Sequence, residues 1–195
     1  MKEEWANSLH ESKDGAALKS SSSESSSWVA APDKVSSKLF RRGFKLRSNL
    51  MTTRARQARW KSSAHEVKCR HGCPSIESLQ HIIQRCHYTH SSRVYRHDRV
   101  VKRLVKIAER HNRKVLVEPQ IPLAPTYIKP DIILIHNKHA VVIDVQVCGD
   151  VNAERAFSGK VKKYGSPLCH SRILSFFNTV GFEVDSIFHA PFILS

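Results

Sequence analysis

The chain has 195 residues, of which 32 are Lys or Arg and 17 are Asp or Glu, and its formal net charge is +15 at pH 7. A hydrophobic content of 41% is enough for the core of one domain, and no run of about 20 apolar residues is present to span a membrane. We expect an intracellular protein without a secretory signal, whose excess positive charge favours a polyanion, most commonly nucleic acid, as its partner.

Residues 1–38 have the composition of a disordered linker. Between Ser20 and Ser27 every position except Glu24 is serine, and such a tract buries too little apolar surface to offset its ordering entropy.

Residues 39–66 form a basic arm, helical or extended. Charges of one sign at this density repel one another unless phosphates neutralise them, so the arm is a candidate nucleic-acid contact; a solvated charged surface is the alternative. The candidate contacts are Arg54, Arg56 and Arg59.

Residues 67–91 contain a cluster of residue types that bind zinc. Three, seven and four residues separate its successive members, which are Cys69, Cys73, His81 and Cys86. Three thiolates and one imidazole are a ligand set for a tetrahedral Zn²⁺, and an odd total of five cysteines fits a reducing compartment better than disulfides. A closed four-ligand site leaves no open position for chemistry, so this zinc module would be structural.

The zinc module has a local turn and several competing ligands. Gly72 allows the tight turn that brings Cys69 and Cys73 to one ion. Other imidazoles compete for the fourth position, namely those of His71, His87 and His90. The alternative for the whole cluster is three buried cysteines without a metal.

The remaining residues, 92–195, predict a mixed sheet flanked by helices. A helix is expected at 92–112, where apolar residues recur at helical spacing, with Ser91 or Ser92 as its N-cap. Strands are expected at 114–118, 131–135, 140–147, 182–187 and 192–194, and further helices at 153–164 and 169–179. Central runs that are apolar on both faces indicate a sheet covered on both sides, and hence an α/β fold.

Two aspartates are expected to meet on a hairpin of this sheet. If Asn137-Lys138 is a two-residue turn, His136 pairs with His139, and counting back along both strands places Asp131 opposite Asp144. Like charges at that separation are destabilising unless a cation lies between them, and Mg²⁺ binds through one or two carboxylates. In the alternative interpretation, Asp131 caps a strand and Asp144 pairs with a nearby Lys or Arg.

A site that cleaves phosphodiesters also needs a cation to stabilise developing negative charge. The position two residues after Asp144 holds Gln146, so the lysine must come from elsewhere. The candidates, in order of preference, are Lys160, Lys163 and Lys129. Glu118 is a candidate additional metal ligand, with a solvated strand-end glutamate as the alternative.

Four motifs in this order resemble the carboxy-terminal part of the R-two-type, site-specific non-LTR retrotransposon polyproteins, which insert into ribosomal RNA genes. The first is the Cys69-Cys73-His81-Cys86 cluster and the second is Arg96-His97-Asp98. The third is Lys129-Pro130-Asp131 with Asp144, and the fourth is Lys160 with Lys163-Tyr164. The resemblance extends over nearly the whole chain.

The resemblance implies a restriction-endonuclease-like fold of the PD-(D/E)XK type, in which Asp131 and Asp144 bind a catalytic Mg²⁺ and the lysine has moved onto a helix. In that family the endonuclease nicks target DNA, and the exposed 3′ hydroxyl primes reverse transcription of the element RNA. The zinc module and Arg96-His97 are implied to handle nucleic acid. Asp98 departs from the family's Asn, and His97 falls on the apolar stripe of its helix, so a packed structural histidine is the alternative there.

The expected protein is a Mg²⁺-dependent DNA endonuclease with a structural Zn²⁺. Its partners would be target DNA, with ribosomal RNA genes as the candidate target, and element RNA as a second candidate, in the nucleus. No reverse transcriptase palm is recognisable in the 195 residues, so we interpret the chain as a fragment or decayed copy of a polyprotein that is truncated within its endonuclease domain. The alternative function is a catalytically silent, zinc-dependent remnant that binds nucleic acid.

Overall fold

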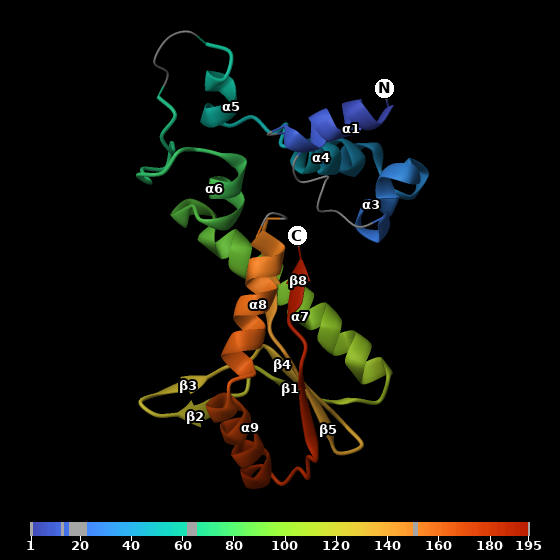
Figure 1. Cartoon of the computed structure of the whole chain (residues 1–195), viewed down its shortest axis with the longest axis vertical. Coiled ribbons are helices and arrows are strands. Elements are labelled where there is room, and N and C mark those ends of the chain that lie inside the picture. Colours follow the sequence, from blue (N-terminus) through green and yellow to red (C-terminus); the bar gives the residue numbers. More distant parts are fainter. Residues whose placement is uncertain (1, 13, 16–22, 62–65, 150–151, 195) are drawn as a thin grey trace. The chain divides into compact units, whose positions relative to one another are not determined.

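The computed structural model describes residues 2–12, 14–15, 23–61, 66–149 and 152–194 (Figure 1). The chain divides into two compact units, Met1–Arg93 with Gly149–Val151, and Val94–Cys148 with Asn152–Ser195. Among the described residues, none of the helices combines the length and apolarity that a membrane span requires.

The first unit begins with short helices. They are α1 (Lys2–Glu11), α3 (Ser23–Ala30), the 3-10 helix η1 (Pro32–Lys34) and α4 (Ser37–Arg47). Much of the range that composition predicted as a disordered linker is therefore helical, while residues 16–22, with the start of the serine tract, lie outside the described residues. An aromatic contact anchors this segment, because Trp28 packs edge-on against Phe40 with ring centroids 5.5 Å apart.

The zinc-ligand residues follow in the same unit. Its next elements are α5 (Arg54–Ala58), α6 (Leu79–Gln84) and the 3-10 helix η2 (His87–Thr89). The helix α7 (His90–Arg110) continues directly from η2, so Ser91 and Ser92 lie inside it and the prediction that either is its N-cap was wrong. The preceding turn is tied to α6, since the Thr89 hydroxyl lies 2.5 Å from the Ile82 carbonyl oxygen and 3.2 Å from that of Cys86.

The second unit is built on a mixed four-stranded sheet. Its order is β1-β4-β5-β7, where β1 (Lys114–Val117), β4 (Ile132–His136) and β5 (His139–Ile143) are antiparallel neighbours and β7 (Ser186–His189) is parallel to β5. The strands β2 (Ile121–Leu123) and β3 (Thr126–Ile128) form a hairpin that the sequence analysis missed, because each is short and Pro122 interrupts the first.

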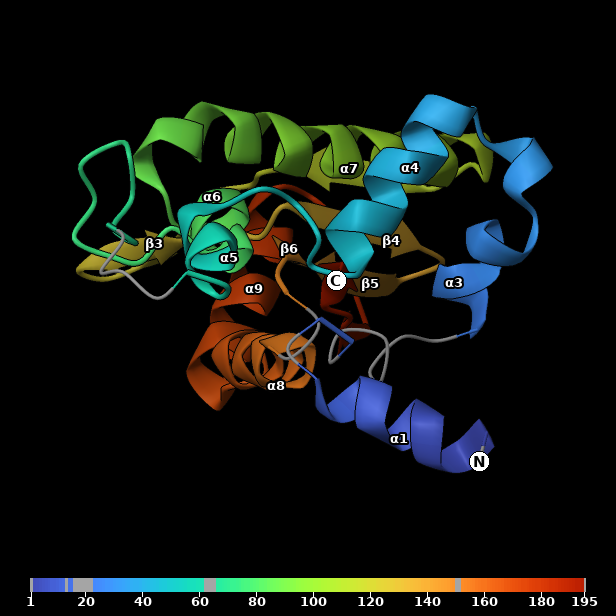
Figure 2. The same ribbon diagram turned by 90° about the horizontal axis from the view of Figure 1, so that it is seen from above.

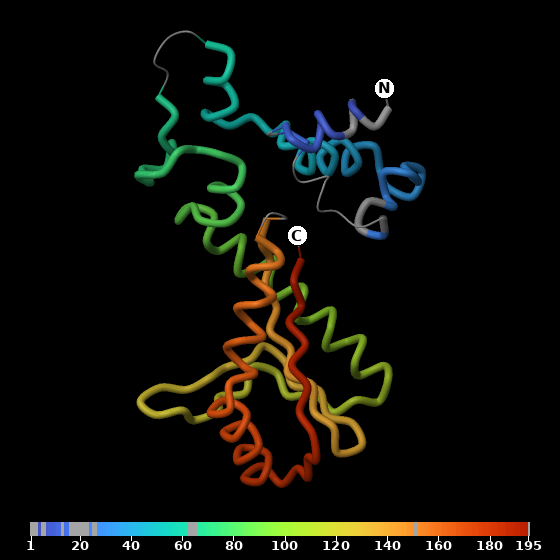
Figure 3. The backbone as a smooth tube through the Cα atoms, viewed as in Figure 1, coloured from blue at the N-terminus to red at the C-terminus, as the bar shows by residue number. Residues whose placement is uncertain are grey.

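The rest of this unit contains two helices and a further strand pair. These are α8 (Ala153–Tyr164), α9 (Pro167–Thr179), β6 (Val145–Val147) and β8 (Phe192–Leu194), with β6 and β8 parallel. The single strand predicted at 140–147 is thus divided at Asp144, and the strand predicted at 182–187 begins later, at Ser186. In the backbone trace the chain runs along α8, turns into α9 and returns through β7 and β8 (Figure 3).

Alternation along β4 produces two apolar cores. Ile133 and Ile135 pack in the core that contains Tyr164 of α8 and residues of α9. Ile132, which points to the opposite face, packs in the core that contains Val101 of α7. Figure 2 shows α7 on one side of the strands and α8 and α9 on the other. The predicted mixed sheet flanked by helices is confirmed.

The predicted hairpin is also confirmed. Asn137 and Lys138 have φ angles of 47° and 64°, the left-handed conformations of a type I′ turn. His136 pairs with His139, and the ladder ends at the pair formed by Ile132 and Ile143. Asp131 and Asp144 are therefore the next residues beyond the last pair, which brings them to the same end of the hairpin.

Candidate functional site

The four predicted zinc-ligand residues lie together in the first unit. The ligand atoms of Cys69, Cys73, His81 and Cys86 are all within 4.8 Å of one another. The Cys86 Sγ atom lies 3.7 Å from Cys69 Sγ and 3.8 Å from Cys73 Sγ. A tetrahedral Zn²⁺ with bonds of about 2.3 Å to sulfur requires an Sγ–Sγ separation of about 3.8 Å, so the thiolates have the spacing of a zinc site.

His81 supplies an independent test of the fit. Its side chain is buried, and neither ring nitrogen has a hydrogen-bond partner among the described residues. A buried imidazole without partners is costly, and a metal ion bound among the three thiolates would satisfy one nitrogen. The cluster can therefore bind zinc.

The competing histidines have other contacts. His71 stacks on Tyr88 with ring centroids 3.7 Å apart, and the Arg93 guanidinium lies 3.4 Å from His90 Nδ1. His87 stays close to the cluster, with its Nδ1 atom 3.1 Å from Cys73 Sγ. His81 and His87 are thus the two imidazoles that a ligand test must separate.

Local structure positions the first two thiolates and His81. Gly72 has a φ angle of 78°, a left-handed conformation that favours glycine, and its amide donates to the Cys69 carbonyl oxygen across the turn. Ser78 caps α6 by accepting from the His81 amide, which fixes the first turn of the helix that carries the imidazole.

Glu77 is a residue of this unit that the sequence analysis missed. Its carboxylate is buried and accepts from Arg70 Nε at 2.8 Å and Nη2 at 2.6 Å, and from the Arg54 and Arg70 backbone amides at 3.0 Å. The bonds from Arg70 outweigh burial and lower the pKa of Glu77 to about 2. Glu77 is the only acidic residue between positions 67 and 91, and this isolation among basic residues is the sequence feature that could have indicated a buried ion pair.

The three arginines predicted to contact nucleic acid have partners within the chain. Arg54 donates to the Lys68 carbonyl oxygen at 3.1 Å and pairs with Glu66 at 3.2 Å. Arg56 and Arg59 both pair with Asp14, at 3.1 and 2.7 Å. Their role in nucleic-acid binding stays a prediction.

The carboxylate cluster, which we define as Asp131 and Asp144 with their contacts, lies in the second unit. Asp131 Oδ2 accepts from the Val145 amide at 2.6 Å, and Asp144 Oδ2 accepts from Lys160 Nζ at 2.5 Å. The two aspartate side chains are 14% and 8% exposed. Burial and the neighbouring Asp144 both raise the pKa of Asp131, which is the electrostatic sign of two carboxylates sharing one site.

The structure distinguishes the three candidate lysines. Lys160 on α8 contacts Asp144, whereas Lys163 directs its ammonium to the Tyr164 hydroxyl at 3.0 Å. Lys129 pairs with Glu118 at 2.5 Å. The Glu118 carboxylate thus pairs with a lysine at the surface and does not join the two aspartates. Only its backbone amide is in contact with this region, where it donates to the Asp131 carbonyl oxygen. The Lys160–Asp144 contact is compatible with both the catalytic and the ion-pair interpretation of the sequence.

His97 joins this cluster from α7. Its Nε2 atom lies 3.3 Å from Asp131 Oδ2 and its Nδ1 atom lies 3.3 Å from Asp98 Oδ1. Burial favours the neutral imidazole, but Asp98 and Asp131 outweigh it and raise the pKa of His97. His97 was predicted as a contact for nucleic acid or a packed histidine, and no pattern in the sequence indicated its contact with Asp131.

Tyr164, which belongs to the fourth motif of the sequence analysis, is another member of the neighbourhood. It is only 2% exposed, and its hydroxyl lies 3.4 Å from the Lys129 carbonyl oxygen. Burial, together with the charge of Asp144, raises the pKa of Tyr164, so the phenol stays neutral. The arrangement can bind a cation between two carboxylates and present an ammonium beside them.

Comparison with known proteins gives a consistent set of relatives, while no protein-family model matches the chain. A Retrovirus-related Pol polyprotein from type-2 retrotransposable element R2DM of Drosophila melanogaster is 32% identical over 95% of this chain. Pol polyproteins from type-1 retrotransposable element R2 are 36% identical over 75% of the chain in Popillia japonica and 32% identical over 84% in Nasonia vitripennis. The chain covers 18%, 31% and 16% of the lengths of these three relatives.

Proposed function

We propose that this chain, which is homologous to the Pol polyproteins of R2 retrotransposable elements, is the DNA endonuclease part of such a polyprotein. The observation that carries the proposal is the position of buried Asp144 and partly buried Asp131 at the same end of a hairpin, with Lys160 in contact with Asp144. A retrotransposon polyprotein has nucleic acid as its natural substrate, and two carboxylates with an adjacent cation suit phosphodiester hydrolysis.

The proposed fold is restriction-endonuclease-like, of the PD-(D/E)XK type. It is supported by an antiparallel hairpin whose end carries both aspartates, by β7 parallel to β5, and by helices on both faces of the sheet. The lysine would come from α8, since Gln146 occupies the strand position that a lysine would hold.

In the proposed mechanism Asp131 and Asp144 would hold Mg²⁺, which would supply Lewis acidity to the site. The Val145 amide and His97 hold Asp131 in a fixed orientation. Lys160 keeps a positive charge beside the carboxylates, where it stabilises negative charge that develops on the phosphate oxygens. Tyr164 is buried and neutral, and its hydroxyl lies by the Lys129 carbonyl oxygen, two residues before Asp131.

The zinc module would have a structural role. Zn²⁺ bound by Cys69, Cys73, His81 and Cys86 would hold the turn, α6 and the flanking basic residues in one shape. The proposed partners are target DNA, with element RNA as a second nucleic acid and a reverse transcriptase in the full-length polyprotein. The proposed location is the nucleus, where chromosomal DNA is found.

Nicking of supercoiled plasmid tests this function. The purified chain with Mg²⁺ or Mn²⁺ should convert supercoiled to open-circular DNA, whereas Asp131→Ala and Asp144→Ala should not, although they keep their affinity for DNA. Asp185→Ala removes an exposed carboxylate from the same unit and should nick as the parent does. Equal nicking by all four proteins would contradict the proposal.

A second candidate function is a catalytically silent module that binds nucleic acid. It is favoured by the contacts that both aspartates already make, because Lys160 on Asp144 and the Val145 amide on Asp131 stabilise the carboxylates without a metal. This candidate predicts zinc-dependent, salt-sensitive DNA binding with no cleavage by the parent protein.

A further inference from the structure

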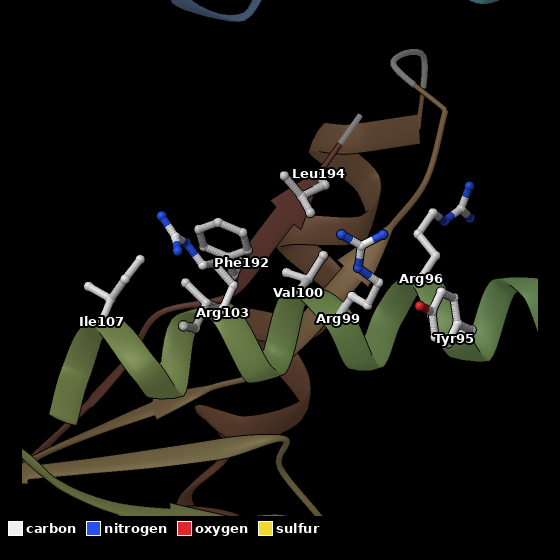
Figure 4. A pocket seen from close by; sticks show the side chains of 9 residues that line it. Tyr95, Arg96, Arg99, Val100, Arg103, Ile107, Phe192 and Leu194 are labelled. Atoms are coloured by element: carbon white, nitrogen blue, oxygen red, sulfur yellow. The ribbon is translucent and has the colours of Figure 1, made fainter. Parts of the chain in front are cut away.

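A groove lies between α7 and β8 in the second unit. Its volume is about 520 Å³, and Figure 4 shows side chains from the helix and the strand directed toward the space between them. It is lined by Tyr95, Arg96, Arg99, Val100, Arg103, Leu104, Ile107, Phe192 and Leu194. None of these residues belongs to the carboxylate cluster.

The floor of the groove is apolar. Ile107 is 40% exposed and Phe192 is 36% exposed, and Val100 and Leu104 lie on the same face of α7. Apolar side chains that gather in one exposed concave surface mark a site that binds a partner. The partner must therefore present a flat or apolar group to Phe192.

One edge of the groove is strongly basic. Arg96, Arg99 and Arg103 follow one another at intervals of three and four residues, so they lie along one side of α7 over about 10 Å of its length. None of the nine lining residues is acidic. A row of positive charge beside an apolar floor complements a chain of phosphates that carries flat bases.

We propose that this groove binds single-stranded DNA, with bases against Phe192 and the apolar floor and phosphates along Arg99 and Arg103. A duplex keeps its bases stacked inside, so it would leave the apolar floor without a partner, whereas single strands offer their base faces to aromatic side chains. Deoxyribose fits against the floor better than ribose, because the apolar floor offers no polar group to a 2′ hydroxyl, and the choice of DNA rests on the proposed endonuclease function.

Binding of a fluorescein-labelled oligothymidylate of about 20 nucleotides to the full chain, followed by anisotropy, tests the basic edge. The double variant Arg99→Gln/Arg103→Gln should bind at least about tenfold more weakly, and the slope of log K against log salt should fall by about 1.4. The matched control Lys102→Gln/Lys162→Gln removes the same charge from exposed positions outside the groove and should bind within about threefold of the parent.

Phe192 tests the apolar floor. Phe192→Leu keeps an apolar side chain without the ring and should weaken oligothymidylate binding by about fivefold or more, while an abasic oligomer with the same number of phosphates should bind parent and variant alike. Oligouridylate of the same length should bind the parent more weakly than oligothymidylate. Circular dichroism and zinc content establish that each variant is folded.

Three results would overturn the inference. The first is equal binding of oligothymidylate by the arginine variant and its lysine control. The second is binding of oligouridylate as tight as or tighter than that of oligothymidylate, which would show that the groove does not select DNA. The third is a concentration-dependent dimer that Phe192→Leu abolishes, which would make a second copy of the chain the occupant. Asp131→Ala should keep full oligothymidylate binding, so failure of nicking and failure of this site are separate observations.

Discussion

The Nε2 atom of His97 lies 3.3 Å from Asp131 Oδ2, so a residue of α7 contacts a carboxylate at the end of the β4–β5 hairpin. The imidazole is partly buried, and its second nitrogen faces Asp98. When it is protonated, His97 adds a positive charge, beside that of Lys160, to a site that holds two aspartates.

The first prediction concerns the pH dependence of stability. Because Asp98 and Asp131 raise the pKa of His97 above its unfolded value of about 6.5, protonated His97 stabilises the fold below that pH, and this contribution is lost as pH rises through the folded pKa. Urea unfolding in metal-free buffer should show that His97→Gln destabilises the chain more at about pH 5.5 than at about pH 8.5. The same substitution at exposed His136 is the control; an equal loss at both pH values for His97→Gln would refute the ion pair.

The second prediction concerns Glu77. Replacing it with Gln leaves the Arg70 guanidinium without its carboxylate partner and should lower the free energy of unfolding by about 2 kcal/mol at neutral pH. Since the folded pKa is about 2, below the unfolded value, the contribution is present above about pH 4.5 and is lost as pH falls toward 2. Urea denaturation of the zinc-bound chain measures it. Glu183→Gln, at an exposed ion pair with Lys138, should leave the midpoint unchanged.

The third prediction separates the two imidazoles near the thiolates. If His81 is the fourth ligand, His81→Ala should weaken zinc binding by more than about 100-fold in a chelator competition, because a ligand is lost and not merely an outer contact. His87→Ala should bind zinc within about tenfold of the parent. The reverse order of affinities would assign the fourth position to His87.

The fourth prediction ranks the lysines. Lys160→Ala should slow plasmid nicking by about 100-fold or more, because its ammonium is the one that reaches the carboxylates. Lys163→Ala should have a small effect, since Lys163 contacts Tyr164 instead. Initial rates at saturating Mg²⁺ measure both. A larger loss for Lys163→Ala than for Lys160→Ala would reverse the assignment.

Sequence was sufficient wherever a local rule determined the structure. The Asn137-Lys138 turn fixed the register of β4 and β5 by counting, and the helix expected at 153–164 has the same bounds as α8, Ala153–Tyr164. Ligand spacing brought Cys69, Cys73, His81 and Cys86 together. These features depend on neighbours in the chain or on residue types with one dominant chemistry.

Contacts between residues far apart in the chain could not be predicted from the sequence by such local rules. His97 reaches Asp131 across 34 positions, and no periodic pattern specifies that pairing. The apolar stripe of α7 places His97 near the sheet but leaves its partner open. The short β2–β3 hairpin was missed because Pro122 weakens the strand pattern in the sequence. In the structure the hairpin forms nevertheless, because it packs against the core.

The proposed centre is tested most directly by plasmid nicking across a Mg²⁺ titration with the parent chain and Asp144→Asn. This substitution keeps the shape of the side chain and removes its charge. We predict that nicking by the parent requires Mg²⁺ and saturates with it, and that Asp144→Asn binds DNA without nicking it. Nicking without a divalent cation, or retained by Asp144→Asn, would contradict a metal site built on this pair of aspartates.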